Sequence, residues 1–392
     1  MNIEEATEKM KRIQSVLLEF IDNELNSEES YEKFIQVITD QKIIEDRYKL
    51  KSVLQLINSI SSNHQRNLNF IDKIERILTL FKKDIQNYYF NSEIFELFSD
   101  NKRILLFLFQ EKMIIIDEYI VSRITSDEFI NKKYAQYFSP EIKPFLTEEF
   151  ITKYSYKNQI LKNNDFMKEI NNKELPNEFY NKRKEGENDN FLCELIRTDK
   201  GKEFGVYINK MCLSYESNIE ESFFETNPLL LNNNDEITLI EYAAFFGSIE
   251  IIKYMRMNGE VELTSSTWQF AIHSQNAELI KYLEDNKFPP PENNYEKILE
   301  ESIQCHHNDV SKYIIDYLIN DEDLHNDIEN KSYENLYFYA VKFDNYLFYP
   351  KNMKCKNIFY YLCQFDHYTL VKLFLQSIKI DLNSTTIKTL IF

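Results

Sequence analysis

Residues 238–247 read Thr-Leu-Ile-Glu-Tyr-Ala-Ala-Phe-Phe-Gly, and residues 249–255 read Ile-Glu-Ile-Ile-Lys-Tyr-Met. Thr238 is a favoured helix N-cap, and Gly247 suits a helix end because glycine adopts a positive φ without steric cost. The second stretch repeats apolar residues three positions apart, as one face of an amphipathic helix does. The pattern predicts a short helix, a tight turn and a second helix, with the paired alanines allowing the two helices to approach closely.

The same pattern recurs along the second half of the chain. Similar stretches include Trp268 and Ser302, and weaker copies centre on Ala340 and Leu362. A hairpin of this size cannot bury its apolar face alone, so successive units have to stack. Self-similarity at a period of about 30 residues is typical of solenoid proteins, and it predicts an α-solenoid over residues 190–392.

The rest of the chain also has a helical pattern. Residues 1–136 carry apolar residues at helical spacing with no convincing strand alternation, and residues 137–189 combine prolines with a long polar run. We therefore expect an all-helical N-terminal block (1–136), a connector with some helix (137–189) and a repeat array (190–392). Only 5 glycines and 8 prolines occur in 392 residues, which disfavours sandwiches, barrels and Rossmann folds. The predicted fold class is all-α.

Charge and cysteine content indicate the compartment and exclude some partners. The formal net charge is −18, and no dense basic face is visible, so we expect no nucleic-acid partner. The charged start lacks the apolar segment of a secretory signal, and no apolar run is long enough to insert into a membrane. The five cysteines form no disulfide framework. We expect an intracellular, cytoplasmic protein.

The stretch 238–247 resembles the ankyrin repeat, whose signature is T-P-L-H-x-A-A-x-x-G. Glu241 stands at the signature histidine, and the glycine column is filled in later copies by His306, Asp344 and Asp366. The resemblance implies stacked helix hairpins whose β-hairpin fingers are trimmed to loops.

A more specific resemblance extends over about residues 140–392. The runs at 186–190, 223–228 and 240–248 look like a large ankyrin-like family of unknown function that is expanded in trichomonad protists. That family implies the fold and an intracellular location. It carries no established reaction, so no catalytic residue is transferred from it.

Motifs for chemistry are scarce in this sequence. No phosphate-binding loop, zinc-protease motif or nucleophile elbow is present, so we expect no enzyme activity and no cofactor. Cys305-His306-His307 and the set Cys355, Cys363 and His367 could supply metal ligands, but they lack the closely spaced cysteine pairs of structural zinc sites. We prefer core packing for them and expect Cys363 in the buried column of Ala244.

The predicted function is a non-enzymatic scaffold that binds a protein partner on the concave face of the array. The alternative is an adaptor, for example in ubiquitin ligation, that recruits machinery through the N-terminal block. The triple proline at 289–291 is interpreted as a stiff connector, with a polyproline ligand as the alternative. Ankyrin-like arrays bind through the end of the first helix and the loop before it, and this resemblance implies as candidate partner-binding residues Phe245, Phe246, His273, Ser274, Gln304, Cys305, Lys342, Phe343, Gln364 and Phe365.

Overall fold

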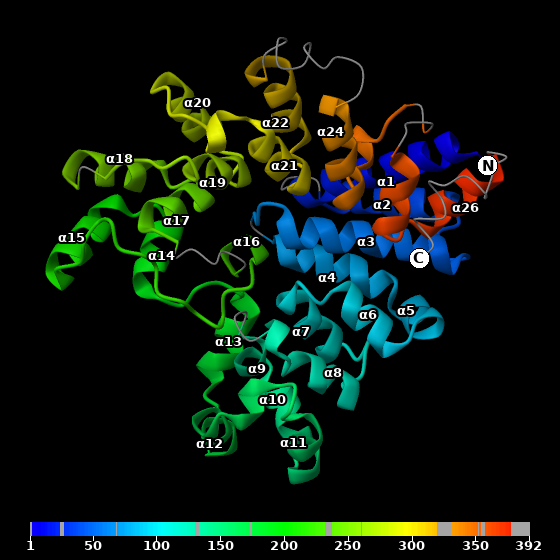
Figure 1. Ribbon diagram of the computed structural model, residues 1–392, viewed down its shortest axis with the longest axis horizontal. Coiled ribbons are helices and arrows are strands. Elements are labelled where there is room, and N and C mark those ends of the chain that lie inside the picture. Colours follow the sequence, from blue (N-terminus) through cyan, green and yellow to red (C-terminus); the bar gives the residue numbers. More distant parts are fainter. Residues whose placement is uncertain are drawn as a thin grey trace. The chain divides into compact units, whose positions relative to one another are not determined.

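The computed structural model describes most of the chain: residues 2–23, 27–67, 69–129, 133–172, 175–231, 237–259, 261–319, 331–351, 353 and 357–377. Within these residues the chain is all-helical and contains no strand longer than a single bridge (Figure 1). That bridge is antiparallel and joins Asn218 to Thr238. The predicted fold class is therefore confirmed at the level of secondary structure.

The chain divides into two compact units. Unit 1 combines Met1–Leu78 with Pro291–Phe392, and unit 2 is Thr79–Pro290. The expected boundaries at 136 and 189 both lie inside unit 2. The division after Pro290 falls within the triple proline that the sequence predicts to be a connector.

Unit 1 brings the two ends of the chain together. Helix α1 packs against α2 and α26, while α3 packs against α21 and α26, so the blue N-terminal helices lie beside the orange and red ones in Figure 1. Helix α4 (Phe70–Leu80) runs across the boundary into unit 2. The other helices of unit 1 are α1 (Ile3–Asp22), α2 (Ser27–Asp40), α3 (Arg47–Asn63), η4 (Pro291–Asn293), α21 (Glu296–Gln304), α22 (Asn308–Tyr313), η5 (Ile314–Leu318), α24 (Lys331–Lys342), η6 (Tyr346–Phe348), α25 (Ile358–Gln364) and α26 (Tyr368–Ser377).

Local sequence accounts for the start of these helices. The side chain of Asn2 accepts a hydrogen bond from the Glu5 amide at the start of α1, and Asp46 does the same for Tyr48 and Lys49 at the start of α3. Leu17 and other apolar residues at helical spacing on α1 are fully buried, as the pattern predicts.

Unit 2 contains three successive helix hairpins at its C-terminal end. These are α14 with α15, α17 with α18 and α19 with α20, and their first helices pack in the series α14, α17, α19. The helices of unit 2 are α5 (Lys82–Tyr88), α6 (Asn91–Leu97), α7 (Lys102–Gln110), α8 (Glu118–Ile124), η1 (Asp127–Phe129), α9 (Tyr134–Tyr137), α10 (Ser139–Ile142), η2 (Lys143–Phe145), α11 (Glu148–Tyr154), η3 (Gln159–Lys162), α12 (Asn164–Asn172), α13 (Asn177–Glu185), α14 (Phe191–Arg197), α15 (Gly201–Met211), α16 (Pro228–Leu231), α17 (Leu239–Phe246), α18 (Ile249–Asn258), α19 (Thr267–His273) and α20 (Ala277–Asp285).

The turn between the two helices of a hairpin has one repeated geometry. Gly247 has a φ of 67°, and the non-glycine residues at the same place have φ values from 48° to 58°. In five of these hairpins the residue after the turn donates its amide to a carbonyl five positions earlier, which is the hydrogen bond of a Schellman motif. The donor and acceptor residues are Lys200 and Leu195, Ser248 and Ala243, His307 and Ser302, Asn345 and Ala340, and His367 and Leu362.

A second hydrogen bond links one turn to the preceding hairpin. Ser248 Oγ donates to the Ile196 carbonyl at 2.6 Å, and Asn345 Nδ2 donates to the Ile303 carbonyl at 3.0 Å. His367 Nε2 lies 2.9 Å from the Val341 carbonyl. In each case the acceptor stands three residues before the positive-φ residue of the preceding hairpin. The same bond therefore joins α14 to α17 in unit 2, and α21 to α24 and α24 to α25 in unit 1.

The prediction for Cys363 is wrong. Its side chain is exposed although the turns align it with Ala244, and Leu362, which aligns with Ala243, is the fully buried residue of α25. Cys212, the left-handed C-cap residue of α15, is exposed as well. Cys355 lies outside the described residues.

Candidate functional site

The predicted partner-binding residues of unit 2 are mostly buried. The ring of Phe245 stacks on His273 with 4.2 Å between centroids, and both side chains are at most 5% exposed. Ser274 is buried and donates to the Ala271 carbonyl at 2.8 Å. Phe246 is half-buried, with its ring 4.9 Å from that of Tyr242. Phe246 is therefore the predicted residue of unit 2 that keeps part of its surface open to solvent.

Two of the predicted residues of unit 1, Gln304 and Phe343, contact helix α3 of the same chain. Gln304 Nε2 donates to Asn63 Oδ1 at 2.7 Å, and the Phe343 carbonyl accepts from Ser59 Oγ at 2.7 Å. Asn63 and Ser59 both lie on α3. Cys305 is fully buried.

The other three predicted residues of unit 1 are more open. Lys342 is half-buried and pairs with Glu300 at 2.9 Å. Phe365 is half-buried against Phe338, with ring centroids 5.5 Å apart, and Gln364 is exposed.

Helix α3 extends this contact to the last hairpin. Lys51 Nζ lies 2.5 Å from Asp366 Oδ2, and the ring of Tyr48 stacks on Tyr368 at 3.9 Å between centroids. The turn residues of α21, α24 and α25 are thus met by one continuous helix from the other end of the chain. Sequence reasoning missed this contact. The available signal was a set of serines beside the apolar residues of α3, and those at 52, 59, 61 and 62 are all buried.

A buried polar network joins α1 to the same turns. Gln14 Nε2 donates to Asn345 Oδ1 at 2.7 Å and to His306 Nδ1 at 3.1 Å, while Gln14 Oε1 accepts from the Leu347 amide at 3.3 Å. His306 Nε2 faces the Phe343 carbonyl at 3.0 Å, so the ring proton sits on Nε2 and Nδ1 is an acceptor. Burial lowers the pKa of His306 to about 3, which keeps this imidazole neutral.

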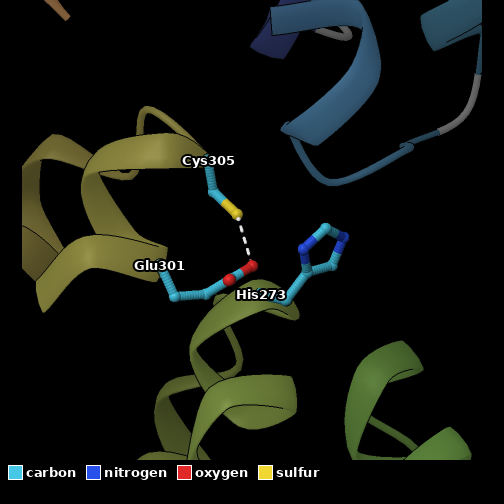
Figure 2. A group of neighbouring side chains, drawn as sticks. All are labelled: His273, Glu301 and Cys305. Carbon is cyan, nitrogen blue, oxygen red and sulfur yellow. Dashed lines mark hydrogen bonds between the residues drawn. The ribbon is translucent and has the colours of Figure 1, made fainter. Parts of the chain in front are cut away.

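Figure 2 draws Glu301 and Cys305 of unit 1, together with His273 of unit 2. Cys305 Sγ donates to Glu301 Oε1 at 3.2 Å, and burial beside this carboxylate raises the pKa of the Cys305 thiol well above its usual value. Burial also raises the pKa of Cys193 to about 12. A thiol in such surroundings stays protonated and is a poor nucleophile or metal ligand, so these cysteines act as core residues.

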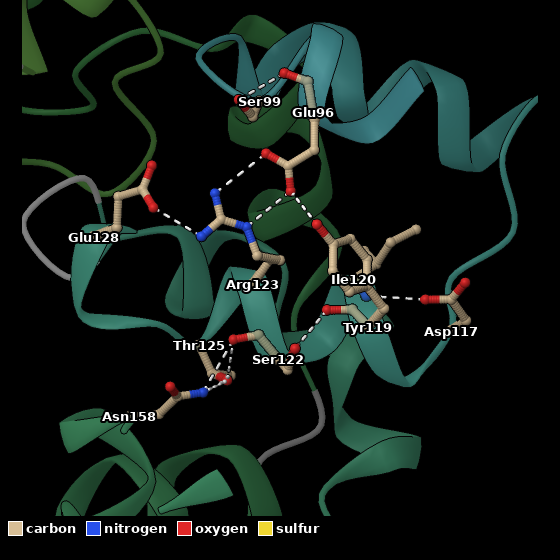
Figure 3. Close-up of polar contacts among 10 residues, drawn as sticks. All are labelled: Glu96, Ser99, Asp117, Tyr119, Ile120, Ser122, Arg123, Thr125, Glu128 and Asn158. Carbon is tan, nitrogen blue, oxygen red and sulfur yellow. Dashed lines mark hydrogen bonds and ion pairs between the residues drawn. The ribbon is translucent and has the colours of Figure 1, made fainter. Parts of the chain in front are cut away.

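A polar cluster in unit 2 surrounds Arg123 (Figure 3). Arg123 Nε pairs with Glu96 at 2.8 Å, its Nη1 pairs with Glu128 at 2.7 Å, and Tyr119 donates to Glu96 at 2.7 Å. Burial opposes ionisation of Glu96, but the hydrogen bonds from Arg123 and Tyr119 outweigh it and lower its pKa. The guanidinium is already shared between two carboxylates, so the cluster fastens α6, α8 and η1 together.

Compared with known proteins, the chain matches no protein-family model, no curated protein sequence and no solved structure. Among the described residues, none of the helices combines the length and apolar character needed to cross a bilayer.

Proposed function

We propose that the chain is a non-enzymatic scaffold for protein–protein interaction, built as an intracellular solenoid of degenerate ankyrin-like hairpins. The observation that carries the proposal is the repeated side-chain hydrogen bond from Ser248, Asn345 and His367 to the preceding hairpin. A bond that recurs in one register makes neighbouring hairpins stack the same way, and stacked hairpins generate the extended surfaces that repeat proteins use for binding.

The ionisable groups in the hairpins favour a scaffold over an enzyme. The buried thiols of Cys193 and Cys305 are held protonated, and burial lowers the pKa of His367 to about 4. A nucleophile needs an activating base, and a general base needs a pKa near the working pH. These groups have neither property, and their hydrogen bonds serve packing.

We place the partner at the C-terminal ends of the first helices of the hairpins in unit 2. In unit 1 the corresponding turns already contact α3 through Ser59, Asn63 and Lys51. In unit 2 the ring of Phe246 is partly exposed beside Tyr242, and a partly exposed aromatic residue is the usual anchor of an interface.

The adaptor alternative is supported less well. It needs an N-terminal block that is free to recruit other machinery. Helices α1 and α3 are instead packed against α21 and α26, and Gln14 joins the buried network of Asn345.

The test compares binding and folding in one variant. Phe246→Ala should reduce the protein partners captured from the cell that expresses the chain, because the anchor ring is removed. Its melting temperature should fall by only a few degrees, since the ring is half-buried. The matched control is Phe90→Ala, which removes a phenylalanine that is 75% exposed elsewhere in unit 2.

Three outcomes decide the proposal. The proposal is supported if proteins captured by the unmodified chain are no longer captured by Phe246→Ala but are still captured by Phe90→Ala. Unfolding of Phe246→Ala makes the ring a core residue and removes the proposed face. Unchanged capture by a folded Phe246→Ala variant places the partner elsewhere.

A further inference from the structure

The hairpin of α14 and α15, the first in the series of unit 2, carries exposed apolar side chains. Phe191 on α14 is 51% exposed, and Val206 on α15 is 69% exposed. The half-buried ring of Tyr207 packs against Phe191, with 5.2 Å between the ring centroids. Terminal repeats of a stacked array need a polar outer surface, and clustered exposed apolar side chains are typical of an interaction site. The cluster of Phe191, Val206 and Tyr207 is therefore a candidate contact surface.

The opposite side of α15 is packed within the chain. Phe204 is fully buried, and Gly205 lies against Tyr254 of the neighbouring helix α18. Successive residues of an α-helix are rotated by about 100°, so Glu203 and Tyr207 lie on the side of α15 that faces away from α18. Because α14 and α15 begin the series α14, α17, α19, this side is where a further hairpin of the stack would lie.

Two opposite charges flank the apolar residues of α15. Glu203 and Lys210 are both exposed, and neither forms an ion pair with another of the residues that the structure describes. They are seven positions apart, which is close to two helical turns, so they lie on one side of α15 about 10 Å apart along its axis. The midpoint between them falls between Val206 and Tyr207. Along the helix the surface is therefore negative, then apolar, then positive.

This order of charges is complementary to itself when the helix direction is reversed. If a second α15 packs antiparallel to the first about that midpoint, Glu203 of each copy faces Lys210 of the other copy. Val206 and Tyr207 of both copies then meet at the centre. A two-fold interface requires such self-complementarity, because each contact occurs twice with the roles exchanged. A parallel pair of helices would instead bring like charges together, which is unfavourable.

We propose that two copies of the chain associate through this surface, with their α15 helices antiparallel and Phe191, Val206 and Tyr207 at the centre of the contact. Each copy contributes mainly one helix of three turns, and interfaces of small area are weak, so the association depends on concentration. The contact is separate from the partner face around Phe246 on α17, so either proposal can fail without the other.

The first experiment is sedimentation equilibrium of the full chain at concentrations from about 5 to about 500 µM. The average mass of the unmodified chain should rise with concentration towards that of a dimer. Val206→Glu brings two carboxylates together at the centre and should stay monomeric over the same range. The matched control is Ile115→Glu, because Ile115 is 67% exposed elsewhere in unit 2, and it should associate like the unmodified chain. An unmodified chain that is monomeric throughout, or a Val206→Glu variant that associates equally well, would overturn the proposal.

Charge reversal tests the antiparallel arrangement. Glu203→Lys and Lys210→Glu each replace two ion pairs of the dimer by two like-charge contacts, so each should weaken association roughly five- to thirtyfold. The two substitutions combined in one chain restore opposite charges and should return the dissociation constant to within about threefold of the unmodified value. An equal mixture of the two single variants should associate more tightly than either variant alone. Single variants that associate normally, or a combined variant that does not recover, would contradict the antiparallel contact.

Discussion

Asn345 joins the N-terminal and C-terminal parts of unit 1 through buried hydrogen bonds, so Asn345→Ala tests how unit 1 is held together. Its side chain is fully buried and makes three hydrogen bonds. Nδ2 donates to the Ile303 carbonyl at 3.0 Å and to Asn308 Oδ1 at 2.9 Å, and Oδ1 accepts from Gln14 Nε2 at 2.7 Å. The alanine variant removes all three and leaves their partners behind.

The magnitude follows from those partners. The Ile303 carbonyl and the Gln14 amide each keep a second bond to His306, so the variant loses three hydrogen bonds of about 1 kcal/mol each without leaving either group wholly unpaired. We expect the free energy of unfolding of unit 1 to fall by about 3 kcal/mol. For a domain of this size that corresponds to a drop of about 10 °C in its melting temperature.

The assay is differential scanning calorimetry with circular dichroism on the full chain. The control is Asn286→Ala, because Asn286 is exposed and makes one local bond to the Tyr282 carbonyl at 2.7 Å, so its loss should cost less than about 0.5 kcal/mol. If Asn345→Ala melts within 2 °C of the Asn286→Ala variant, the bonds between α1 and the hairpin turns do not hold unit 1 together.

Three further predictions concern single residues. Ala243→Leu overfills a fully buried position in α17 and should cost about 1–3 kcal/mol; a wild-type melting temperature would show that α17 and α18 do not pack closely. Glu241→Ala removes the carboxylate that accepts hydrogen bonds from Thr238 at 2.8 Å and Thr264 at 3.2 Å, so the free energy of unfolding should fall by about 2 kcal/mol. The control Glu278→Ala removes an exposed carboxylate and should lower it by less than about 1 kcal/mol. Equal losses of the two variants in melting experiments would refute this difference. Burial lowers the pKa of His306 to about 3. The contribution of the neutral imidazole to the free energy of unfolding is therefore complete above pH 6.5 and is lost as the pH falls towards 3. Between pH 7 and 5 the wild type should lose about 2 kcal/mol more than His306→Asn in denaturant titrations, and equal losses would contradict a neutral, buried imidazole.

The hairpins could be predicted because their signals are local and periodic. Thr238 caps α17 as expected, and the position of Gly247 has a positive φ in later copies even where His306 or Asp344 replaces glycine. Non-glycine residues adopt that conformation when the surrounding hydrogen bonds compensate for its cost. The spacing of the repeats therefore located these turns better than residue type did.

The contacts of α3 could not be predicted, because they join residues far apart in the sequence and follow no period. Ser59 and Phe343 are an example, and neither residue type specifies the other. The burial of single positions in the weakest copies was equally out of reach, since Leu362 and Cys363 are both apolar and only the packed structure shows which one faces the core.

The central claim is that α3 lies on the turns of the C-terminal hairpins, and a zero-length carbodiimide cross-link tests it most directly. Lys51 Nζ lies 2.5 Å from Asp366 Oδ2, so the reagent should join these residues, which are 315 positions apart, in an amide that mass spectrometry identifies. The pair Lys253 and Glu278, at 2.8 Å within unit 2, is the positive control. We predict both cross-links in the monomeric fraction. Formation of the Lys253–Glu278 link without the Lys51–Asp366 link would contradict the claim.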